Sequence, residues 1–228
     1  MKLVIPCAGR STRMGSSKPK VLLEINGKSI LKHIVELWEP LIDSIMLVVR
    51  DKAVILEMMG YRPFQFVIQE KPKGIADAIL LTEPYIDGKF LVVLGDCLHK
   101  GTFDIFNFDL GIGVWKEGTE GDIKAGYSVT IQGDVVKRVI EKPRVVSPDE
   151  YCGMGIYFFD RRIFSYIKQT PASPLRDEVE ITDVIEKMIE AGEVIKPVYF
   201  SGTYVNVNTP EDLERAEWML QRNEKAKE

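Results

Sequence analysis

The stretch KLVIPCAG at residues 2–9 decides the fold. Residues 2–6 form a nearly continuous apolar run, which is typical of a strand buried on both faces of a parallel sheet. Residues 7–9 are small, so the backbone can turn there and approach a ligand closely. A buried strand followed by a small-residue turn indicates an α/β fold.

Three more runs of this kind follow in the first half of the chain, at residues 44–49, 64–68 and 90–94. Helices are expected between them, at residues 29–39 and 75–86. The first helix is supported by apolar residues at the 3.6-residue period, namely Ile30, Leu31, Ile34, Leu37 and Trp38. Strand–helix–strand repeats of this length give right-handed crossovers, so we expect a doubly wound sheet.

The second half of the chain has a different pattern. Residues 124–131 and 135–140 flank a Gln-Gly-Asp turn and are expected to form a hairpin, and residues 154–159 supply another strand. Thr209 at the cap and Pro210 at the first helical position predict a final helix. No linker-like stretch separates the two halves, so we expect a single domain.

Composition restricts the class of protein. The 228 residues carry a formal charge of −4, which disfavours a nucleic-acid partner. The three cysteines, Cys7, Cys97 and Cys152, are far apart and indicate neither a disulfide framework nor a zinc site. No stretch approaches the ~20 apolar residues of a membrane span, and the N-terminal run is too short for a signal peptide. We therefore expect a cytoplasmic protein without a membrane partner.

The loop after the first strand is rich in small residues and cations. Residues 8–20 read AGRSTRMGSSKPK. Backbone N–H groups in such a turn can hold phosphate oxygens, while Arg and Lys side chains neutralise them. The loop lacks the spacing of a P-loop and of a dinucleotide-binding turn. Its composition alone is equally compatible with a polar surface loop.

The order of residues in this region is more specific. The run PCAGRSTRMGSSKPKVLLEINGKSIL at residues 6–31 resembles the A-G-x-G-[ST]-R-M-x(n)-P-K-x-L signature of sugar-1-phosphate nucleotidyltransferases. It is most similar to the uridylyltransferases that act on N-acetylglucosamine 1-phosphate, and thymidylyltransferases are similar too. Ser11 stands where the family usually has glycine. The resemblance implies a Rossmann-like, doubly wound, mixed and mostly parallel sheet.

In this family the loop backbone holds the nucleotide. The resemblance implies contacts to base and ribose from three residues and contacts to the phosphates from two more: Cys7, Ala8 and Gly9, then Arg13 and Lys20. Lys18 has no clear counterpart and can equally be a solvated surface residue.

Residues 69–78, QEKPKGIADA, resemble the family segment Q-x(4)-G-[TI]-[AG]-x-A. The amide of Gln69 offers a donor and an acceptor, which suits the edge of a pyrimidine base. Gly74 would allow the chain to approach that base. The alternative is that Gln69 is an exposed residue at the end of a strand.

Asp96 ends the fourth expected strand, at the edge where open α/β sheets bind ligands. A carboxylate there suits Mg²⁺, and the family has its metal-binding aspartate at this point. Further on, YVNVNTPEDL at residues 204–213 resembles the family segment D-x-G-T-P-E-D-L. Asn206 aligns with the second metal-binding aspartate, and Asn208 aligns with the asparagine ligand of the N-acetylglucosamine enzymes. Both are candidate ligands, with Asn208 favoured, and both can equally shape the turn before the helix.

The acceptor side of the family is also matched. Gly126, Glu141 and Lys142 resemble the residues that hold the sugar, with the glutamate on hydroxyl groups and the lysine near the sugar phosphate. Gly153 stands where the N-acetylglucosamine enzymes have an asparagine that contacts the acetamido group. This difference disfavours an N-acetylated sugar.

The resemblance covers nearly the whole chain and implies a function. The expected enzyme transfers a nucleoside monophosphate from an NTP, with a pyrimidine favoured, to a sugar 1-phosphate in the presence of Mg²⁺. The expected catalytic residues are Arg13, Lys20 and Asp96. We expect residues 1–110 to form the nucleotide-binding half and residues 111–228 the acceptor-binding half. The alternatives are a CTP-dependent enzyme for a non-sugar phosphate or phosphonate, and a non-catalytic nucleotide-sensing subunit.

Overall fold

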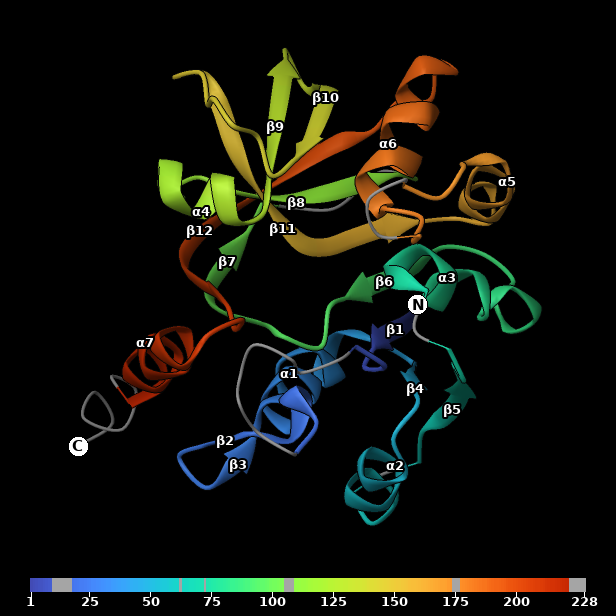
Figure 1. The fold of residues 1–228 in the computed structure, drawn as a ribbon, viewed down its shortest axis with the longest axis vertical. Helices are drawn as coiled ribbons and strands as arrows, with labels where there is room; N and C mark the ends of the chain where they lie inside the picture. Colours follow the sequence, from blue (N-terminus) through green and yellow to red (C-terminus); the bar gives the residue numbers. More distant parts are fainter. Residues whose placement is uncertain (10–17, 62, 72, 105–108, 174–176, 222–228) are drawn as a thin grey trace.

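A central sheet with helices on both faces organises the molecule (Figure 1). The computed structural model describes residues 1–9, 18–61, 63–71, 73–104, 109–173 and 177–221. Arg13 and Ser11 lie outside these residues. Within them, no helix is long and apolar enough to cross a membrane.

The first half of the chain supplies four parallel strands. They are β1 (Lys2–Pro6), β4 (Ser44–Val49), β5 (Gln65–Ile68) and β6 (Phe90–Val93). Their order in the sheet is β5-β4-β1-β6, with β1 paired to β4 on one side and to β6 on the other. All four expected strands are confirmed, although the third begins and the fourth ends one residue inside the expected range.

Apolar side chains alternate between the two faces of these strands. Leu3 and Ile5 belong to one buried cluster, and Val4 between them belongs to the other. Helices α1 (Ile30–Trp38) and α2 (Lys52–Met59) cover the first face. Helix α3 (Gly74–Leu80), together with α5 (Arg162–Gln169) and α6 (Ile181–Glu190), covers the second. Burial on both faces explains why the strands read as continuous apolar runs.

Two expected helices differ in detail from the structure. Leu37, expected on the buried stripe of α1, is exposed. The helix expected at residues 75–86 ends at Leu80, and a short 3₁₀ turn follows at Glu83–Tyr85. Pro84 has no N–H to donate, so an α-helix cannot pass through it without losing a hydrogen bond.

One long strand joins the two halves. β11 (Glu150–Phe159) pairs antiparallel along one edge with β9 (Tyr127–Gln132) and then with β6, and its other edge pairs with β8 (Gly111–Trp115). Beyond β8 lie β12 (Lys196–Asn206) and β7 (Cys97–Phe103). Along this path β11 and β7 run opposite to the other strands. This confirms the mixed, mostly parallel sheet.

The remaining elements complete the second half. β9 and β10 (Val135–Glu141) form the expected hairpin, but its first strand begins later than expected because helix α4 (Glu120–Ala125) precedes it. Helix α7 (Pro210–Gln221) begins as expected, with Thr209 Oγ1 accepting a hydrogen bond from the N–H of Asp212 (3.3 Å). A small separate hairpin consists of β2 (Glu24–Ile25) and β3 (Lys28–Ser29).

Candidate active site

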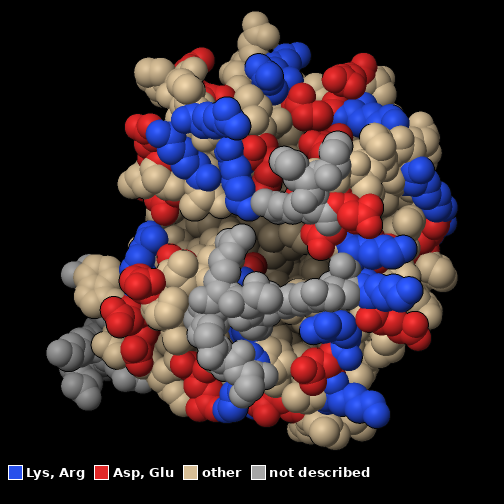
Figure 2. Space-filling model, in the orientation of Figure 1, with Lys and Arg blue, Asp and Glu red and all other residues tan. Residues whose placement is uncertain are grey.

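A cavity of about 660 Å³ lies at the carboxyl ends of β1 and β6 and extends along β11. Figure 2 shows a hollow near the middle of this face of the molecule. Almost all of the site residues expected from the sequence line this cavity: Cys7, Ala8, Gly9, Lys20, Gln69, Gly74, Asp96, Gly126, Glu141, Lys142, Asn206 and Asn208. Arg13, the remaining one, lies outside the described residues. The topology therefore brings residues from both ends of the sequence to one place.

The turn after β1 forms one wall. Cys7 N donates to the carbonyl oxygen of Val48 (2.7 Å), which keeps the chain in the sheet for one residue beyond Pro6. A Cβ atom on Gly95 would lie 2.9 Å from the carbonyl oxygen of Pro6, so only glycine allows the end of β6 to pass this close. Burial raises the pKa of the Cys7 thiol, and the charge of Asp96 raises it further. The thiol is therefore a neutral part of the wall.

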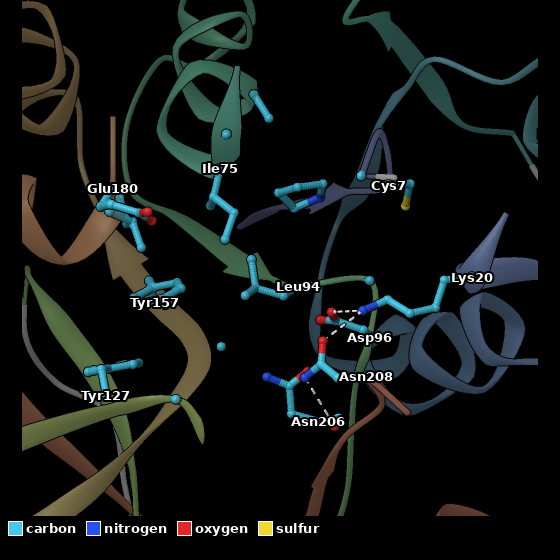
Figure 3. A pocket seen from close by; sticks show the side chains of 18 of the residues that line it. Cys7, Lys20, Ile75, Leu94, Asp96, Tyr127, Tyr157, Glu180, Asn206 and Asn208 are labelled. Atoms are coloured by element: carbon cyan, nitrogen blue, oxygen red, sulfur yellow. Dashed lines mark hydrogen bonds and ion pairs between the residues drawn. The ribbon is translucent and has the colours of Figure 1, made fainter. Parts of the chain in front are cut away.

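A cation and three polar side chains meet at one end of the cavity (Figure 3). Lys20, in a short 3₁₀ helix, donates from Nζ to Oδ2 of Asp96 (2.5 Å) and to Oδ1 of Asn208 (3.2 Å). The N–H of Val207 donates to the carbonyl oxygen of Asp96 (2.9 Å), which fixes the end of β12 against the turn after β6. The pairing of β12 with β7 also brings Asn206 to this end of the cavity, because Asn206 lies opposite Cys97, the residue after Asp96.

The donor set at this end suits a magnesium ion. Oδ1 of Asn206 is buried without a hydrogen-bond partner among the described residues, which is a costly arrangement for an amide oxygen. The described residues hold no cluster of three His, Cys, Asp or Glu side chains that could bind a metal alone. Mg²⁺ prefers oxygen ligands and retains several waters, so one carboxylate and one or two amide oxygens fit its chemistry.

Gln69 lies on another wall, directly after β5. Its side chain is 3% exposed, which contradicts the alternative of an exposed strand-end residue. Nε2 of Gln69 donates to Oδ2 of Asp77 (2.7 Å) and to the carbonyl oxygen of Gly74 (3.3 Å). Gly74 has φ +90°, a conformation that favours glycine, and it opens helix α3.

Gly126, Glu141 and Lys142, which the resemblance assigns to the acceptor, lie close together. The N–H of Lys142 donates to the carbonyl oxygen of Gly126 (2.9 Å), and Lys142 Nζ lies 3.6 Å from Oε1 of Glu141. Lys142 has φ +43°, a left-handed conformation that is uncommon for a residue with a side chain. Strained backbone of this kind is concentrated at ligand sites.

Sequence reasoning missed several residues that line the cavity. Glu178 and Glu180 enter it from the segment before α6, and Tyr157 and Tyr204 enter it from β11 and β12. The sequence around Glu180 resembles the family, but nothing in the spacing shows that its carboxylate faces a ligand cavity. The tyrosines occupy strand positions that are typical of core residues.

Tyr127 lines the cavity next to Gly126 and Gly153. Its hydroxyl donates to the carbonyl oxygen of Met154 (2.7 Å), and its ring lies against Gly153. A Cβ atom on Gly153 would lie 2.0 Å from the ring, so no larger residue fits there without displacing Tyr127. Because burial raises the pKa of the Tyr127 hydroxyl well above its ordinary value, this group stays protonated and able to donate.

Comparisons with known proteins agree with this arrangement. A model described as a MobA-like NTP transferase domain matches residues 3–101, and a model described as nucleotidyl transferase matches residues 113–222. The UTP–glucose-1-phosphate uridylyltransferase AglF of Haloferax volcanii is 30% identical over a match that covers 97% of each chain.

One further relative and one solved structure extend the comparison. The bifunctional protein GlmU of Methanocaldococcus jannaschii is 31% identical over 97% of this chain and 55% of its own length. The chain therefore spans about half the length of the GlmU proteins it matches. A UDP-glucose pyrophosphorylase solved with UDP-glucose has a TM-score of 0.81 at 21% identity, covering 97% of this chain and 98% of the other. That likeness concerns the fold.

Proposed function

Because the chain belongs to the sugar-1-phosphate nucleotidyltransferase family, we propose that it transfers the nucleoside monophosphate of an NTP to a sugar 1-phosphate. Pyrophosphate is the second product. One observation carries this proposal: the Lys20–Asp96–Asn208 group and the Glu141–Lys142 pair line the same cavity. A site for the triphosphate and a site for the acceptor therefore share one space.

The reaction needs no general base. A sugar 1-phosphate is already an anion near pH 7, because the second pKa of such a phosphate is about 6. One of its oxygens attacks the α-phosphorus of the NTP, a new P–O bond forms, and the bond from that phosphorus to the α–β bridging oxygen breaks. The electron pair leaves with pyrophosphate. His99, buried in an apolar cluster, and His33 on α1 have no part in these steps.

Because no general base is needed, the protein contributes to catalysis by neutralising phosphate charge and by positioning the two substrates. Lys20, and Arg13 by resemblance, neutralise the triphosphate as negative charge moves to the leaving group. Asp96 with Asn206 and Asn208 would hold a Mg²⁺ ion, which as a Lewis acid neutralises phosphate oxygens. The wall formed by Cys7, Ala8 and Gly9 holds the nucleoside through its backbone.

The acceptor end supports a sugar without a 2-acetamido group. Glu141 can accept hydrogen bonds from sugar hydroxyls, and Lys142 can pair with the sugar phosphate. The ring of Tyr127 fills the space beside Gly153, so an asparagine that contacts an acetamido group has no room there. Glucose 1-phosphate is the simplest acceptor that meets these conditions.

The two halves work as one domain in this proposal, because β11 pairs with strands of both. We place the reaction in the cytoplasm, where reduced thiols persist, since Cys7, Cys97 and Cys152 are all free and buried.

The proposed function is tested by pyrophosphate release. The purified protein is incubated with Mg²⁺, each of UTP, dTTP, CTP, ATP and GTP, and each of glucose 1-phosphate, N-acetylglucosamine 1-phosphate and phosphocholine. We expect release with a pyrimidine NTP and glucose 1-phosphate. Release only with CTP and phosphocholine would establish the non-sugar alternative. No release in any combination, with NTP binding intact, would favour an acceptor outside this set or a nucleotide sensor.

A further inference from the structure

The amide of Gln69 is held in a single orientation. The N–H of Gln69 donates to the carbonyl oxygen of Val49 (2.9 Å), so its backbone continues the sheet beyond β5. The side chain is buried, and it lines the cavity together with the turn after β1. The backbone hydrogen bond and the burial of the side chain therefore both fix the position of Gln69.

Both N–H groups of this amide have acceptors. One donates to Oδ2 of Asp77 at 2.7 Å, and the other donates to the carbonyl oxygen of Gly74 at 3.3 Å. A primary amide has two N–H donors and no more. An ionised carboxylate and a carbonyl group only accept, so rotating the amide by 180° would place its oxygen against two other oxygens. Asp77 and Gly74 thus exclude the rotated amide.

The partners of Gln69 are themselves fixed. Gly74 has φ +90°, and a Cβ atom there would lie 3.1 Å from Cβ of Glu178, which leaves little freedom in the loop. Asp77 lies in the first turn of α3, whose neighbouring residues Ala76 and Ala78 are buried against the sheet. The carboxylate of Asp77 is therefore presented to Gln69 by a packed helix.

The consequence concerns the base of the nucleotide. With both donors used, Gln69 can offer only its Oε1 to a ligand, and this atom can only accept. Uracil and thymine carry an N–H donor at N3, in the middle of their pairing edge, whereas cytosine has an acceptor there. On the premise of the proposed function, we propose that Asp77 is a positioning residue that makes Gln69 an acceptor and so selects uracil or thymine over cytosine.

The effect of losing Asp77 follows from the same geometry. In Asp77→Asn the new amide can donate as well as accept, so only the longer contact to the carbonyl oxygen of Gly74 (3.3 Å) still opposes the rotated Gln69 amide. The rotated form presents N–H groups toward the base and pairs with the N3 acceptor of cytosine. One such hydrogen bond changes binding by about tenfold. The preference for UTP or dTTP over CTP is expected to fall by about that factor.

The experiment measures base preference in two ways. Equilibrium binding of UTP, dTTP and CTP is measured by calorimetry without acceptor, and kcat and KM are measured with the best acceptor. The wild type is expected to bind UTP or dTTP at least about tenfold more tightly than CTP. In Asp77→Asn the ratio falls through KM, with kcat little changed, because the lost contact is present throughout the reaction.

Asp51→Asn is the matched control. Asp51 caps α2 by accepting from the N–H of Ala53 (2.8 Å), it does not line the cavity, and asparagine also caps helices. Its base preference should equal that of the wild type. Thermal melting confirms that each variant is folded, and Asp77→Ala serves as a second variant that also removes the acceptor.

Three results would overturn the assignment: a wild-type preference for CTP, an unchanged ratio in both Asp77 variants, or an equal change in Asp51→Asn. Binding separates this inference from the proposed function. If no combination releases pyrophosphate but UTP still binds more tightly than CTP, and Asp77→Asn removes that difference, the proposed reaction fails while the role of Asp77 stands.

Discussion

The ammonium group of Lys20 donates hydrogen bonds to Oδ2 of Asp96 (2.5 Å) and Oδ1 of Asn208 (3.2 Å), two oxygen atoms that also suit a magnesium ion. The protein without ligands thus compensates its own carboxylate with a lysine. Binding of a metal and of a triphosphate would give both partners new contacts, the metal for Asp96 and the phosphates for Lys20.

This relationship predicts competition between Lys20 and a divalent cation. In Lys20→Met, Asp96 has no ammonium partner from residue 20, so the variant without nucleotide should bind Mn²⁺ severalfold more tightly than the wild type. Titration followed by the electron paramagnetic resonance signal of free Mn²⁺ measures this directly. Lys18→Met, which changes a lysine 65% exposed and paired with Glu24, is the control. Weaker Mn²⁺ binding by Lys20→Met would show that the lysine does not compete.

Asp96→Ala should lose most of the activity and keep the fold. Removing one such electrostatic contact costs about 10²–10³ in rate. The side chain of Asp96 is 20% exposed and packs at the rim of the cavity, so its loss should disturb little else. Steady-state pyrophosphate release gives the rate, and far-ultraviolet circular dichroism reports the fold. A folded variant with near-normal turnover would remove Asp96 from the site.

Gly153→Ala should destabilise the protein. The added Cβ would lie 2.0 Å from the Tyr127 ring, and overpacking of this kind costs about 1–3 kcal/mol. Urea denaturation of both proteins gives the difference in unfolding free energy. Gly88→Ala is the matched control, because a Cβ atom there has nothing within 4 Å. Equal stability of the two alanine variants would mean that Tyr127 moves aside freely.

His99 predicts a pH dependence of stability. Its ring lies against Trp38, Phe103 and Phe200 at centroid distances of 5.1–5.3 Å, and burial lowers its pKa from 6.5 to about 4. Between these values the unfolded chain binds a proton that the folded protein does not. The free energy of unfolding is therefore unaffected by His99 above pH 6.5. It decreases as the pH falls from 6.5 toward 4, by about 3 kcal/mol in all.

The measurement compares the wild type with His99→Leu. Unfolding free energies from urea titrations at several pH values between 4 and 7 give the slope for each protein. Other groups titrate in both proteins alike, so the difference between the curves isolates His99. Parallel curves over this range would contradict a buried, neutral His99.

Much of the fold was predictable, because burial on both faces leaves a direct pattern in the sequence. The strands expected at residues 2–6 and 44–49 coincide with β1 and β4 for this reason. Helix α4 was not predicted, since Lys124 and Ala125 read as the start of the following strand. Strand β7 was missed as well, because its sequence CLHKGTF has no apolar residue between Leu98 and Phe103.

The site was predictable where a motif named residue types, and the structure brings those residues to one cavity. The orientation of Gln69 was not predictable, because it depends on Asp77 and on the fold of the loop between them. Glu178 was missed for a similar reason: only the three-dimensional structure places it beside Gly74. Contacts between residues on different walls of a cavity produce no periodic pattern in the sequence.

The pairing of β12 with β7 also sets when the site becomes complete during synthesis. Lys20 and Asn208 are 188 positions apart in the chain, yet they form a hydrogen bond. While the ribosome is still making the second half, β1, β4, β5 and β6 can already pair, but Asn206 and Asn208 do not yet exist. A nascent chain therefore lacks Asn206 and Asn208, two of the three proposed metal ligands, until β12 and the turn after it have been made.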